Sequence, residues 1–144
     1  MMIIGRAYAL LRFKVVVALA QGGETLNGKP LIDVGYTAHP SNLSIPADIE
    51  KVKLPLAIDQ GDEDFAMSMT QVKQIQEAFE KKNTEERASK GHERFQINVV
   101  EGAKHGFAVR CDMDKEDEAA QEQIAEDHAV EWFKQWFASK NANA

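Results

Sequence analysis

Two residues of the chain, Asp64 and His105, could carry out acid–base chemistry together. Asp64 ends a Gly-Asp-Glu-Asp segment at 61–64, and His105 is followed by Gly106 and Phe107. A carboxylate that accepts a hydrogen bond from one imidazole nitrogen fixes the tautomer of the ring and stabilises the imidazolium that forms during catalysis. The other nitrogen can then take a proton from a nucleophile, so these residue types indicate attack on a carbonyl group.

Three short apolar runs predict the strands that would position this pair. The runs cover 31–38, 54–59 and 95–100, and they are bounded by proline, glycine and polar residues. Ligand sites in parallel sheets lie beyond the carboxyl ends of the strands. Asp64 follows the second run and His105 the third, so neighbouring strands would bring them side by side. A turn-forming aspartate and a loop histidine are the alternative interpretation.

Three further segments predict helices. The first covers 3–21 and ends at a Gly-Gly pair, after which 24–30 is expected to form a turn. The second follows a capping box of Ser68 and Gln71 and gives way to a polar loop over 81–91. The last helix follows an acidic lead-in, which suits the positive end of a helix dipole. Its inward residues are expected to be Ala125, Ala129, Trp132, Phe133, Trp136 and Phe137.

The order of these elements predicts an α/β fold, with about three parallel strands flanked by helices. The 144 residues suit a single domain, over 1–144. Most sheets have about four to six strands. We therefore expect a truncated domain that forms one end of a larger fold.

Composition and charge argue against several classes of partner. The net charge of −6, without a basic patch, disfavours nucleic acid. No apolar run approaches the roughly 18 residues that cross a bilayer. Cys111 is the single cysteine, so a disulfide within the chain is excluded and a reducing compartment is expected. Residues 1–20 resemble a targeting segment, but the apolar stretch after Lys14 is short, and we predict a cytoplasmic protein.

Several blocks of the sequence occur in an order that resembles dienelactone hydrolase family proteins, particularly fungal ones. The blocks are Thr-Ala-His-Pro-Ser at 37–41, Ile-Pro-Ala-Asp-Ile at 45–49, Leu-Pro at 54–55, Gly-Asp-Glu-Asp at 61–64, and Gly-Ala-Lys-His-Gly-Phe-Ala-Val-Arg at 102–110. Each block alone is weak, whereas the ordered combination over about 13–137 is specific. The resemblance covers the C-terminal half of such proteins and implies a partial α/β-hydrolase fold.

The resemblance also implies an activity and a site. Family members open lactones or esters with a Cys-Asp-His triad, whose acid and histidine match Asp64 and His105. His39 could line the substrate pocket or be satisfied by local hydrogen bonds. Arg110 resembles an arginine that holds a substrate carboxylate in some members. The substrate would be a small ester or lactone, and no cofactor is expected.

The nucleophile of the triad is absent from its expected place. The family elbow, Gly-x-Cys-x-Gly-Gly, should stand just before 14–17, where the chain has Ala-Leu-Leu-Arg-Phe at 9–13. One register puts Leu10 at the nucleophile position and a second puts Ala7 there. Neither side chain can attack a carbonyl. The side chains that could replace the missing nucleophile are the hydroxyls of Ser41 and Ser44 and the thiol of Cys111. The simpler interpretation is that the serines form turns and that the cysteine is an inert loop thiol.

The remaining polar residues predict little further chemistry. His92, in a polar loop, and His128, on the last helix, are expected to be solvated. Asp112, Asp114 and Glu116 hint at calcium, but the spacing lacks the EF-hand glycine and final ligand. A solvated helix N-terminus fits these acids better, so we predict no metal site.

Three interpretations of the whole chain stay open at this point. The chain could be a hydrolase-like protein that lacks the half carrying its nucleophile. It could instead be an inactive homologue that binds a second copy or a full-length paralogue through the exposed edge of the first strand, 31–38. Finally, it could be a fragment with too small a core to persist as a folded protein.

Overall fold

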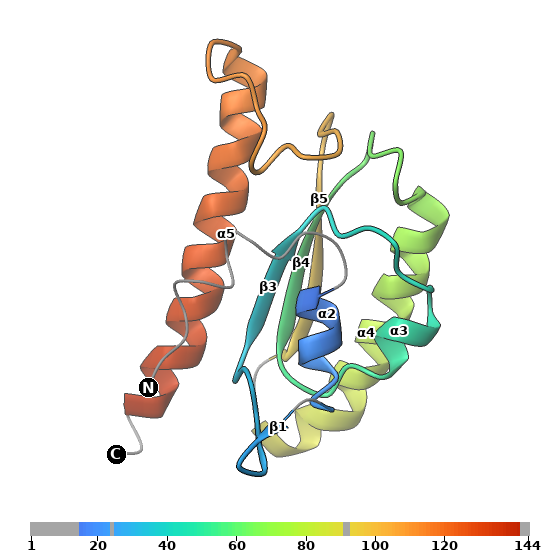
Figure 1. The fold of residues 1–144 in the computed structure, drawn as a ribbon, viewed down its shortest axis with the longest axis vertical. Helices are drawn as coiled ribbons and strands as arrows, with labels where there is room; N and C mark the ends of the chain where they lie inside the picture. Colours follow the sequence, from blue (N-terminus) through green and yellow to red (C-terminus); the bar gives the residue numbers. More distant parts are fainter. Residues whose placement is uncertain (1–14, 24, 91–92, 142–144) are drawn as a thin grey trace.

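A parallel sheet of three strands forms the centre of the molecule (Figure 1). The structure, a computed structural model, describes residues 15–23, 25–90 and 93–141. The strands are β3 (Gly35–Ala38), β4 (Leu56–Gly61) and β5 (Phe95–Val100), in the order β3-β4-β5. The carboxyl ends of parallel strands share one edge of the sheet, so the loops that follow β4 and β5 meet there.

Helices cover both faces of this sheet. Helices α2 (Val15–Ala20), α3 (Ala47–Glu50) and α4 (Met69–Lys90) pack on one face, and α5 (Glu116–Asn141) lies along the other (Figure 1). The predicted α/β fold, with three parallel strands flanked by helices, is confirmed. None of the helices in the described ranges is long and apolar enough to span a membrane.

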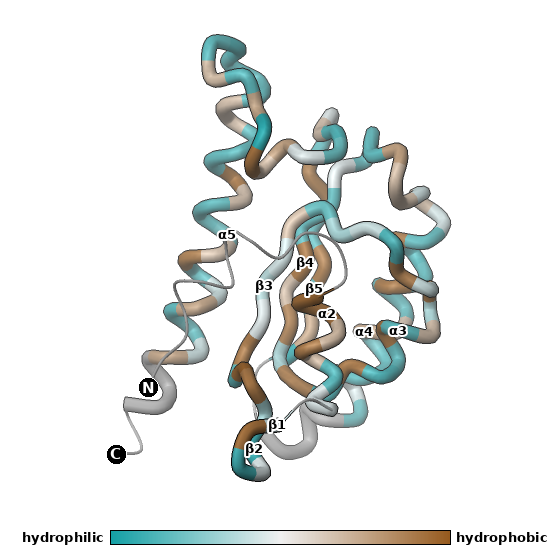
Figure 2. Tube along the Cα trace, in the orientation of Figure 1, coloured by the Kyte–Doolittle hydropathy of each residue, from teal (hydrophilic) through white to brown (hydrophobic). Residues whose placement is uncertain are grey.

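The main hydrophobic core fills the space between the sheet and helices α2, α3 and α4. Figure 2 shows apolar segments of β4, β5 and α2 gathered on this side. Burying one large aliphatic or aromatic side chain contributes about 1.5–3 kcal/mol, so this layer holds the sheet together. Its buried residues are Val16, Val17, Ala20, Ile49, Val52, Leu56, Ile58, Met67, Val72, Ile75, Phe79 and Phe95.

The first predicted helix is described only in part, and the segment after it forms a hairpin. The described part of the helix predicted over 3–21 is α2, and the two nucleophile registers at Leu10 and Ala7 lie outside the described residues. The turn expected over 24–30 contains a small antiparallel hairpin of β1 (Thr25–Leu26) and β2 (Lys29–Pro30). An Asn-Gly pair with positive φ at both residues connects its strands, which suits a tight hairpin turn.

The prediction of a polar loop over 81–91 is wrong. Helix α4 continues through this segment as far as Lys90. Most residues of this segment are good helix formers, and no proline or glycine precedes Gly91 to interrupt the backbone hydrogen bonds. The start of the helix is confirmed, because the Gln71 N–H donates to Ser68 Oγ and the Ser68 N–H donates to Gln71 Oε1.

The predicted strands are confirmed with changed boundaries. The run 31–38 forms a strand only over its last four residues, while the third strand has the predicted bounds. On α5, the inward residues Ala125, Ala129 and Trp132 are buried. The indole Nε1–H of Trp132 donates to the Gly35 carbonyl at 2.8 Å and ties α5 to β3.

Candidate functional site

The loops after β4 and β5 approach each other closely at the edge of the sheet. A Cβ placed on Gly61, at the end of β4, would lie 2.0 Å from the Ala103 carbonyl oxygen, so only glycine fits there. The Glu63 N–H donates to that same carbonyl at 3.1 Å. Gly106 follows His105 with φ of +95°, a conformation that other residues rarely adopt. Together these contacts fix the loops that carry Asp64 and His105.

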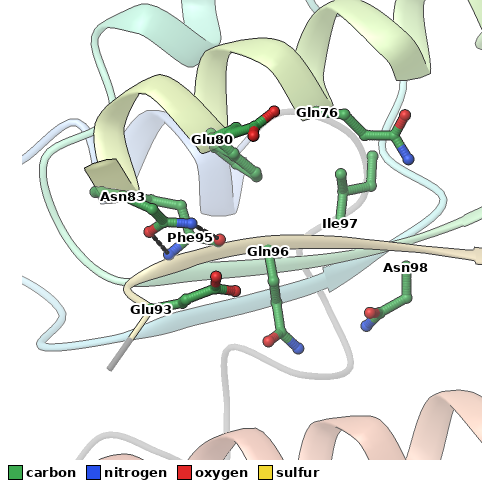
Figure 3. A pocket seen from close by; sticks show the side chains of 9 residues that line it. Gln76, Glu80, Asn83, Glu93, Phe95, Gln96, Ile97 and Asn98 are labelled. Atoms are coloured by element: carbon green, nitrogen blue, oxygen red, sulfur yellow. Dashed lines mark hydrogen bonds between the residues drawn. The ribbon is translucent and has the colours of Figure 1, made fainter. Parts of the chain in front are cut away.

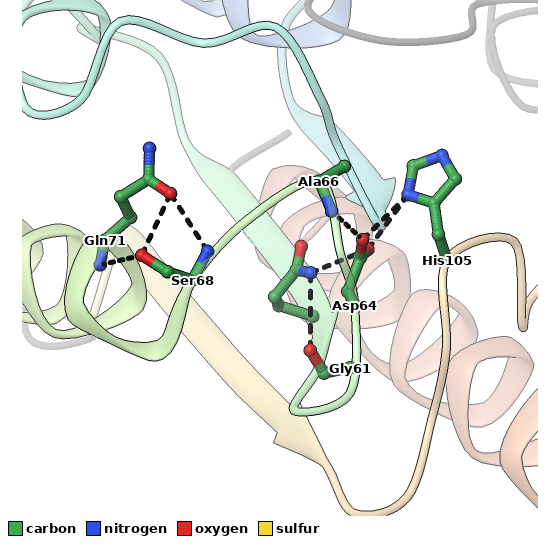
Figure 4. Close-up of polar contacts among 7 residues, drawn as sticks. Gly61, Asp64, Ala66, Ser68, Gln71 and His105 are labelled. Atoms are coloured by element: carbon green, nitrogen blue, oxygen red, sulfur yellow. Dashed lines mark hydrogen bonds and ion pairs between the residues drawn. The ribbon is translucent and has the colours of Figure 1, made fainter.

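Asp64 and His105 form a hydrogen-bonded pair (Figure 4). The Nδ1 atom of His105 lies 3.0 Å from Oδ2 and 3.1 Å from Oδ1 of Asp64. The Asp64 side chain is fully buried, whereas 14% of the His105 side chain remains exposed. Figure 4 shows the second ring nitrogen of His105 pointing away from the carboxylate, where a reacting group could reach it.

Two further donors fix the carboxylate of Asp64. The side-chain amide of Gln60 donates to Oδ2 at 2.8 Å, and the Ala66 N–H donates to Oδ1 at 2.7 Å. Gln60 is itself fully buried in β4. A buried carboxylate needs such partners, because water cannot stabilise its charge. Gln60 was missed in the sequence, although a polar pair at the end of an apolar strand could have indicated a buried polar role.

Two aromatic rings contact the imidazole of His105, and a third packs against one of them. His39 contacts the His105 ring edge to face, with ring centroids 5.1 Å apart, and Phe65 lies at 5.2 Å. Phe107 in turn packs against His39 at 5.7 Å. Burial holds the pKa of His39 below its usual value, and the neighbouring charge of His105 lowers that pKa further. His39 therefore borders the site as a neutral imidazole, while Phe65, which is 89% exposed, borders it as an apolar surface.

The other candidate site residues lie in different surroundings. Arg110 is exposed, and its backbone N–H donates to the Gly106 carbonyl at 2.8 Å, which places it on the turn after His105. Cys111 contacts the sulfur of Met113 at 3.4 Å. The Asp48 N–H donates to the Ser44 carbonyl, and the Ser44 N–H donates to the Asp48 carboxylate, as in a turn. Ser41 is buried.

The expectation that His128 is solvated is wrong. Its Nδ1 atom lies 2.7 Å from Oδ2 of Asp59, a fully buried residue of β4. Asn98 donates to Oδ1 of Asp59 at 2.7 Å, and the Tyr36 hydroxyl lies 3.0 Å from Oδ2. The sequence does not indicate this cluster, because the residues of the cluster come from three strands and α5. His92 lies outside the described residues, within which no three potential ligand groups converge to hold a metal.

The fold and the Asp64–His105 pair together define a class of protein. A parallel sheet with an acid after one strand and a histidine after the next is the arrangement of α/β-hydrolase-type proteins. The model of the dienelactone hydrolase family matches residues 16–137, most of the chain. The chain belongs to the dienelactone hydrolase family, and the expected resemblance is confirmed.

Two curated fungal proteins are similar to the chain. Hydrolase tropI of Talaromyces stipitatus is 34% identical over 109 residues, which cover 76% of this chain and 39% of that protein. Hydrolase pyvD of Aspergillus violaceofuscus is 27% identical over 105 residues, covering 73% of this chain and 39% of that protein. The chain thus matches about two fifths of the length of these relatives.

Proposed function

We propose that the chain carries the acid and the histidine of a hydrolase that acts on a small carboxylic ester or lactone. The observation that carries the proposal is the pair itself. Asp64 holds Nδ1 of His105 at 3.0 Å in a buried position, and the opposite side of the imidazole remains accessible. Membership of the dienelactone hydrolase family supports the same reaction class.

Each residue has a defined role in this proposal. His105 takes the proton of a nucleophile as that nucleophile attacks the carbonyl, and then returns the proton to the leaving alkoxide. Water hydrolyses the acyl intermediate in a second round, in which His105 again accepts and returns a proton. Asp64 fixes the His105 tautomer and stabilises its imidazolium. The nucleophile comes from outside the described residues.

His39 and Arg110 are assigned to substrate binding. The neutral ring of His39 contacts His105 and borders the space beside it. Arg110, on the turn after His105, offers a cation that a substrate carboxylate could engage. Phe65 adds an apolar surface at 5.2 Å from His105, suited to the hydrocarbon part of an ester.

A chimera tests the acid and histidine without requiring a nucleophile from this chain. Residues 16–137 would replace the region of hydrolase tropI that they match, and the rest of that protein would be kept. Hydrolysis of a panel of aryl esters and lactones would be followed. We expect a folded, active chimera that loses about a thousandfold or more in rate on His105→Ala or Asp64→Asn.

The chain offers a matched control for this experiment. His128, on α5, also pairs with a buried aspartate, Asp59 of β4, but neither residue belongs to the loops that carry Asp64 and His105. His128→Ala should leave the rate per folded chimera within about threefold of the parent, because the substitution removes a hydrogen bond between α5 and the sheet and no group of the Asp64–His105 pair. A folded chimera that hydrolyses esters equally well with and without His105 would refute the proposed role.

A second candidate function is binding through β3 by a catalytically inactive homologue. The N–H groups of Gly35 and His39 donate to the loop before β4 and to β4, so the backbone groups of Ala38 point to the opposite side. No strand of the described ranges pairs with that side. We propose a second copy or a full-length paralogue as the partner, because an open strand edge favours pairing.

Light scattering and activity of the 144-residue chain test the second candidate. We expect a dimer that Val34→Lys dissociates, together with no hydrolysis of activated esters. A stable, soluble monomer would count against homodimerisation through this edge, and mixing with a tagged full-length relative would then test the paralogue. Ester hydrolysis that disappears on His105→Ala would show that the chain alone is active and would remove this candidate.

A further inference from the structure

Two buried side-chain atoms at the carboxyl edge of the sheet have no hydrogen-bond partner within the described residues. They are Oε1 of Gln60, which is fully buried in β4, and Oγ of Ser41, a residue that is 5% exposed. Buried polar groups in folded proteins almost always have a partner, because burial removes the hydrogen bonds that water would make. Both atoms therefore require a partner from outside the described residues.

The orientation of the Gln60 amide follows from its neighbours. Its Nε2 atom lies 2.8 Å from Oδ2 of Asp64 and 3.4 Å from the Gly61 carbonyl oxygen. A carboxylate and a carbonyl oxygen both accept hydrogen bonds, so the NH₂ group must face them and the amide oxygen must face the other way. Gln60 thus supports Asp64 with one end of its amide and presents an acceptor with the other end.

Gln60 and Ser41 lie on the same side of the sheet. Side chains alternate along a strand, and Asp59 reaches His128 of α5, so Gln60 is directed to the opposite face, which α2, α3 and α4 cover. Ser41 lies in the segment that leads from the end of β3 to α3 on that same face (Figure 1). One segment of chain on this face could therefore supply both partners.

Helix α2 directs its N-terminal end toward this part of the molecule. At its other end, the Ala20 carbonyl accepts the N–H groups of Lys53 and Leu54, which precede β4. Because α2 packs along the sheet, its first residue, Val15, faces the carboxyl edge of the strands (Figure 1). A segment joined to that end of α2 need not cross the sheet to reach Gln60 and Ser41.

We propose that Gln60 and Ser41 hold the backbone of the segment that carries the nucleophile, an inference that rests on the proposed function. A nucleophile must come within hydrogen-bond reach of the second nitrogen of His105, so the segment that bears it enters at this edge. Gln60 Oε1 accepts one of its backbone N–H groups, and the Ser41 hydroxyl donates to one of its carbonyls. Gln60 is then a positioning residue, whose single amide joins this segment to Asp64.

Amide hydrogen exchange in the chimera with hydrolase tropI tests the contact of Gln60. Gln60→Met removes the acceptor at similar side-chain length, so at least one backbone amide in the tropI part should exchange about fivefold faster or more. Gln96→Met is the matched control and should leave those amides unchanged. Figure 3 shows Gln96 on the face of β5 away from α4, and it is the second residue of that strand.

Ser41→Ala should have opposite effects in two proteins. In the 144-residue chain, whose described residues give the hydroxyl no partner, the substitution should leave the equilibrium constant of unfolding unchanged or lower it. In the chimera it removes a hydrogen bond and should raise that constant about fivefold. Urea unfolding measures both values and requires no enzymatic activity.

Activity of the chimera separates this inference from the proposed function. Gln60→Met should lower kcat about tenfold and leave KM within about twofold, because the residues assigned to substrate binding are unchanged. Asp64→Asn keeps an oxygen that can accept from Gln60 Nε2. It should reduce the rate far more than Gln60→Met does, yet leave the amides of the nucleophile-bearing segment protected.

The outcomes distinguish the two claims. Activity that requires His105, together with unchanged exchange in Gln60→Met, would overturn this inference, assign Gln60 Oε1 to a buried water and leave the proposed function intact. Faster exchange in Gln60→Met, with activity indifferent to His105→Ala, would support the contact and refute the proposed function. If the Gln60→Met chimera does not fold, Ser41→Ala decides, and equal effects of that substitution in the two proteins would overturn the inference.

Discussion

The carboxylate of Asp59 lies 2.7 Å from Nδ1 of His128, so the sheet carries a second acid–imidazole pair besides Asp64 and His105. Asp59 is fully buried in β4, and 36% of the His128 side chain is exposed on α5. The Tyr36 hydroxyl, which also reaches Asp59, lies 2.8 Å from the Ala125 carbonyl of α5. Polar contacts from the strands to a single helix indicate that this pair anchors α5 to the sheet.

His128→Ala should destabilise the fold without touching the candidate active site. The substitution removes one partner of a buried carboxylate, and a hydrogen bond to a charged group contributes about 2 kcal/mol. Urea unfolding would measure the loss, and exchange of the α5 amides should become faster. Glu126→Ala, exposed on the same helix, should change the free energy of unfolding by less than about 0.5 kcal/mol. Equal stability of both variants would contradict an anchoring role.

Asp64→Asn should disturb the tautomer of His105. The carboxylate accepts a hydrogen bond from Nδ1 of His105, whereas an amide can present an N–H group there instead. Nitrogen-15 NMR at alkaline pH would report which ring nitrogen carries the proton in each protein. We expect the proton on Nδ1 in the parent chain and a mixture of tautomers, or the reverse tautomer, in the variant. Glu63→Gln is the control, because Glu63 precedes Asp64 in the sequence and its side chain is exposed. An unchanged spectrum for Asp64→Asn would contradict the assignment.

Gly61→Ala should strongly destabilise the chain. The added methyl group would lie 2.0 Å from the Ala103 carbonyl oxygen and would push apart the loops that hold Asp64 and His105. Overpacking of this kind costs about 1–3 kcal/mol, and urea unfolding would measure it. Gly23→Ala provides the comparison, because nothing lies within 4 Å of its added Cβ. Similar midpoints for both variants would show that the loops separate easily.

Local signals in the sequence were sufficient to predict much of the site. The bounds of β5 follow from a short apolar run between polar segments, and the capping box marks the start of α4. The proximity of Asp64 and His105 follows from placing both residues after neighbouring parallel strands. These features depend on nearby residues or on one general rule of sheet geometry.

Features that depend on distant contacts could not be predicted in this way. His128 and Asp59 are 69 positions apart, and nothing local distinguishes this histidine from a solvated one. The end of α4 was misplaced because charged residues suit a loop and an exposed helix equally well. The burial of Asn83, within that misplaced segment, is explained by its hydrogen bonds to the backbone of Arg94 and Phe95.

The lowered pKa of His39 predicts a pH-dependent contribution to stability. In the unfolded chain His39 takes a proton near its ordinary value of 6.5, whereas burial, and then the charge of His105, delay protonation in the folded chain to lower pH. The unfolded state therefore binds more protons between these two pKa values, and stability falls as pH drops through 6.5 towards the folded pKa. Above 6.5 the contribution of the neutral ring is fully present.

Urea unfolding across this pH window, with His39→Asn as the comparison, would measure the contribution. Asparagine tolerates the positive φ of 41° at this position. The loss of stability on acidification should be smaller in the variant than in the parent chain. Identical pH profiles for the two proteins, or an NMR titration midpoint of His39 above 6.5, would contradict the burial argument.

Asn83→Leu should destabilise the edge of the sheet more than the small change in side-chain volume suggests. Leucine fills a similar volume but leaves the Phe95 N–H and carbonyl without partners, and unsatisfied buried groups cost about 1–3 kcal/mol each. Unfolding in urea would give the total loss, and exchange of the Phe95 amide should accelerate by more than that of the Val72 amide inside α4. Thr84→Ala is the matched control, because the exposed Thr84 hydroxyl donates to the Glu80 carbonyl of its own helix and not to the sheet edge. A stability for Asn83→Leu equal to that of Thr84→Ala would show that water replaces the amide at this edge.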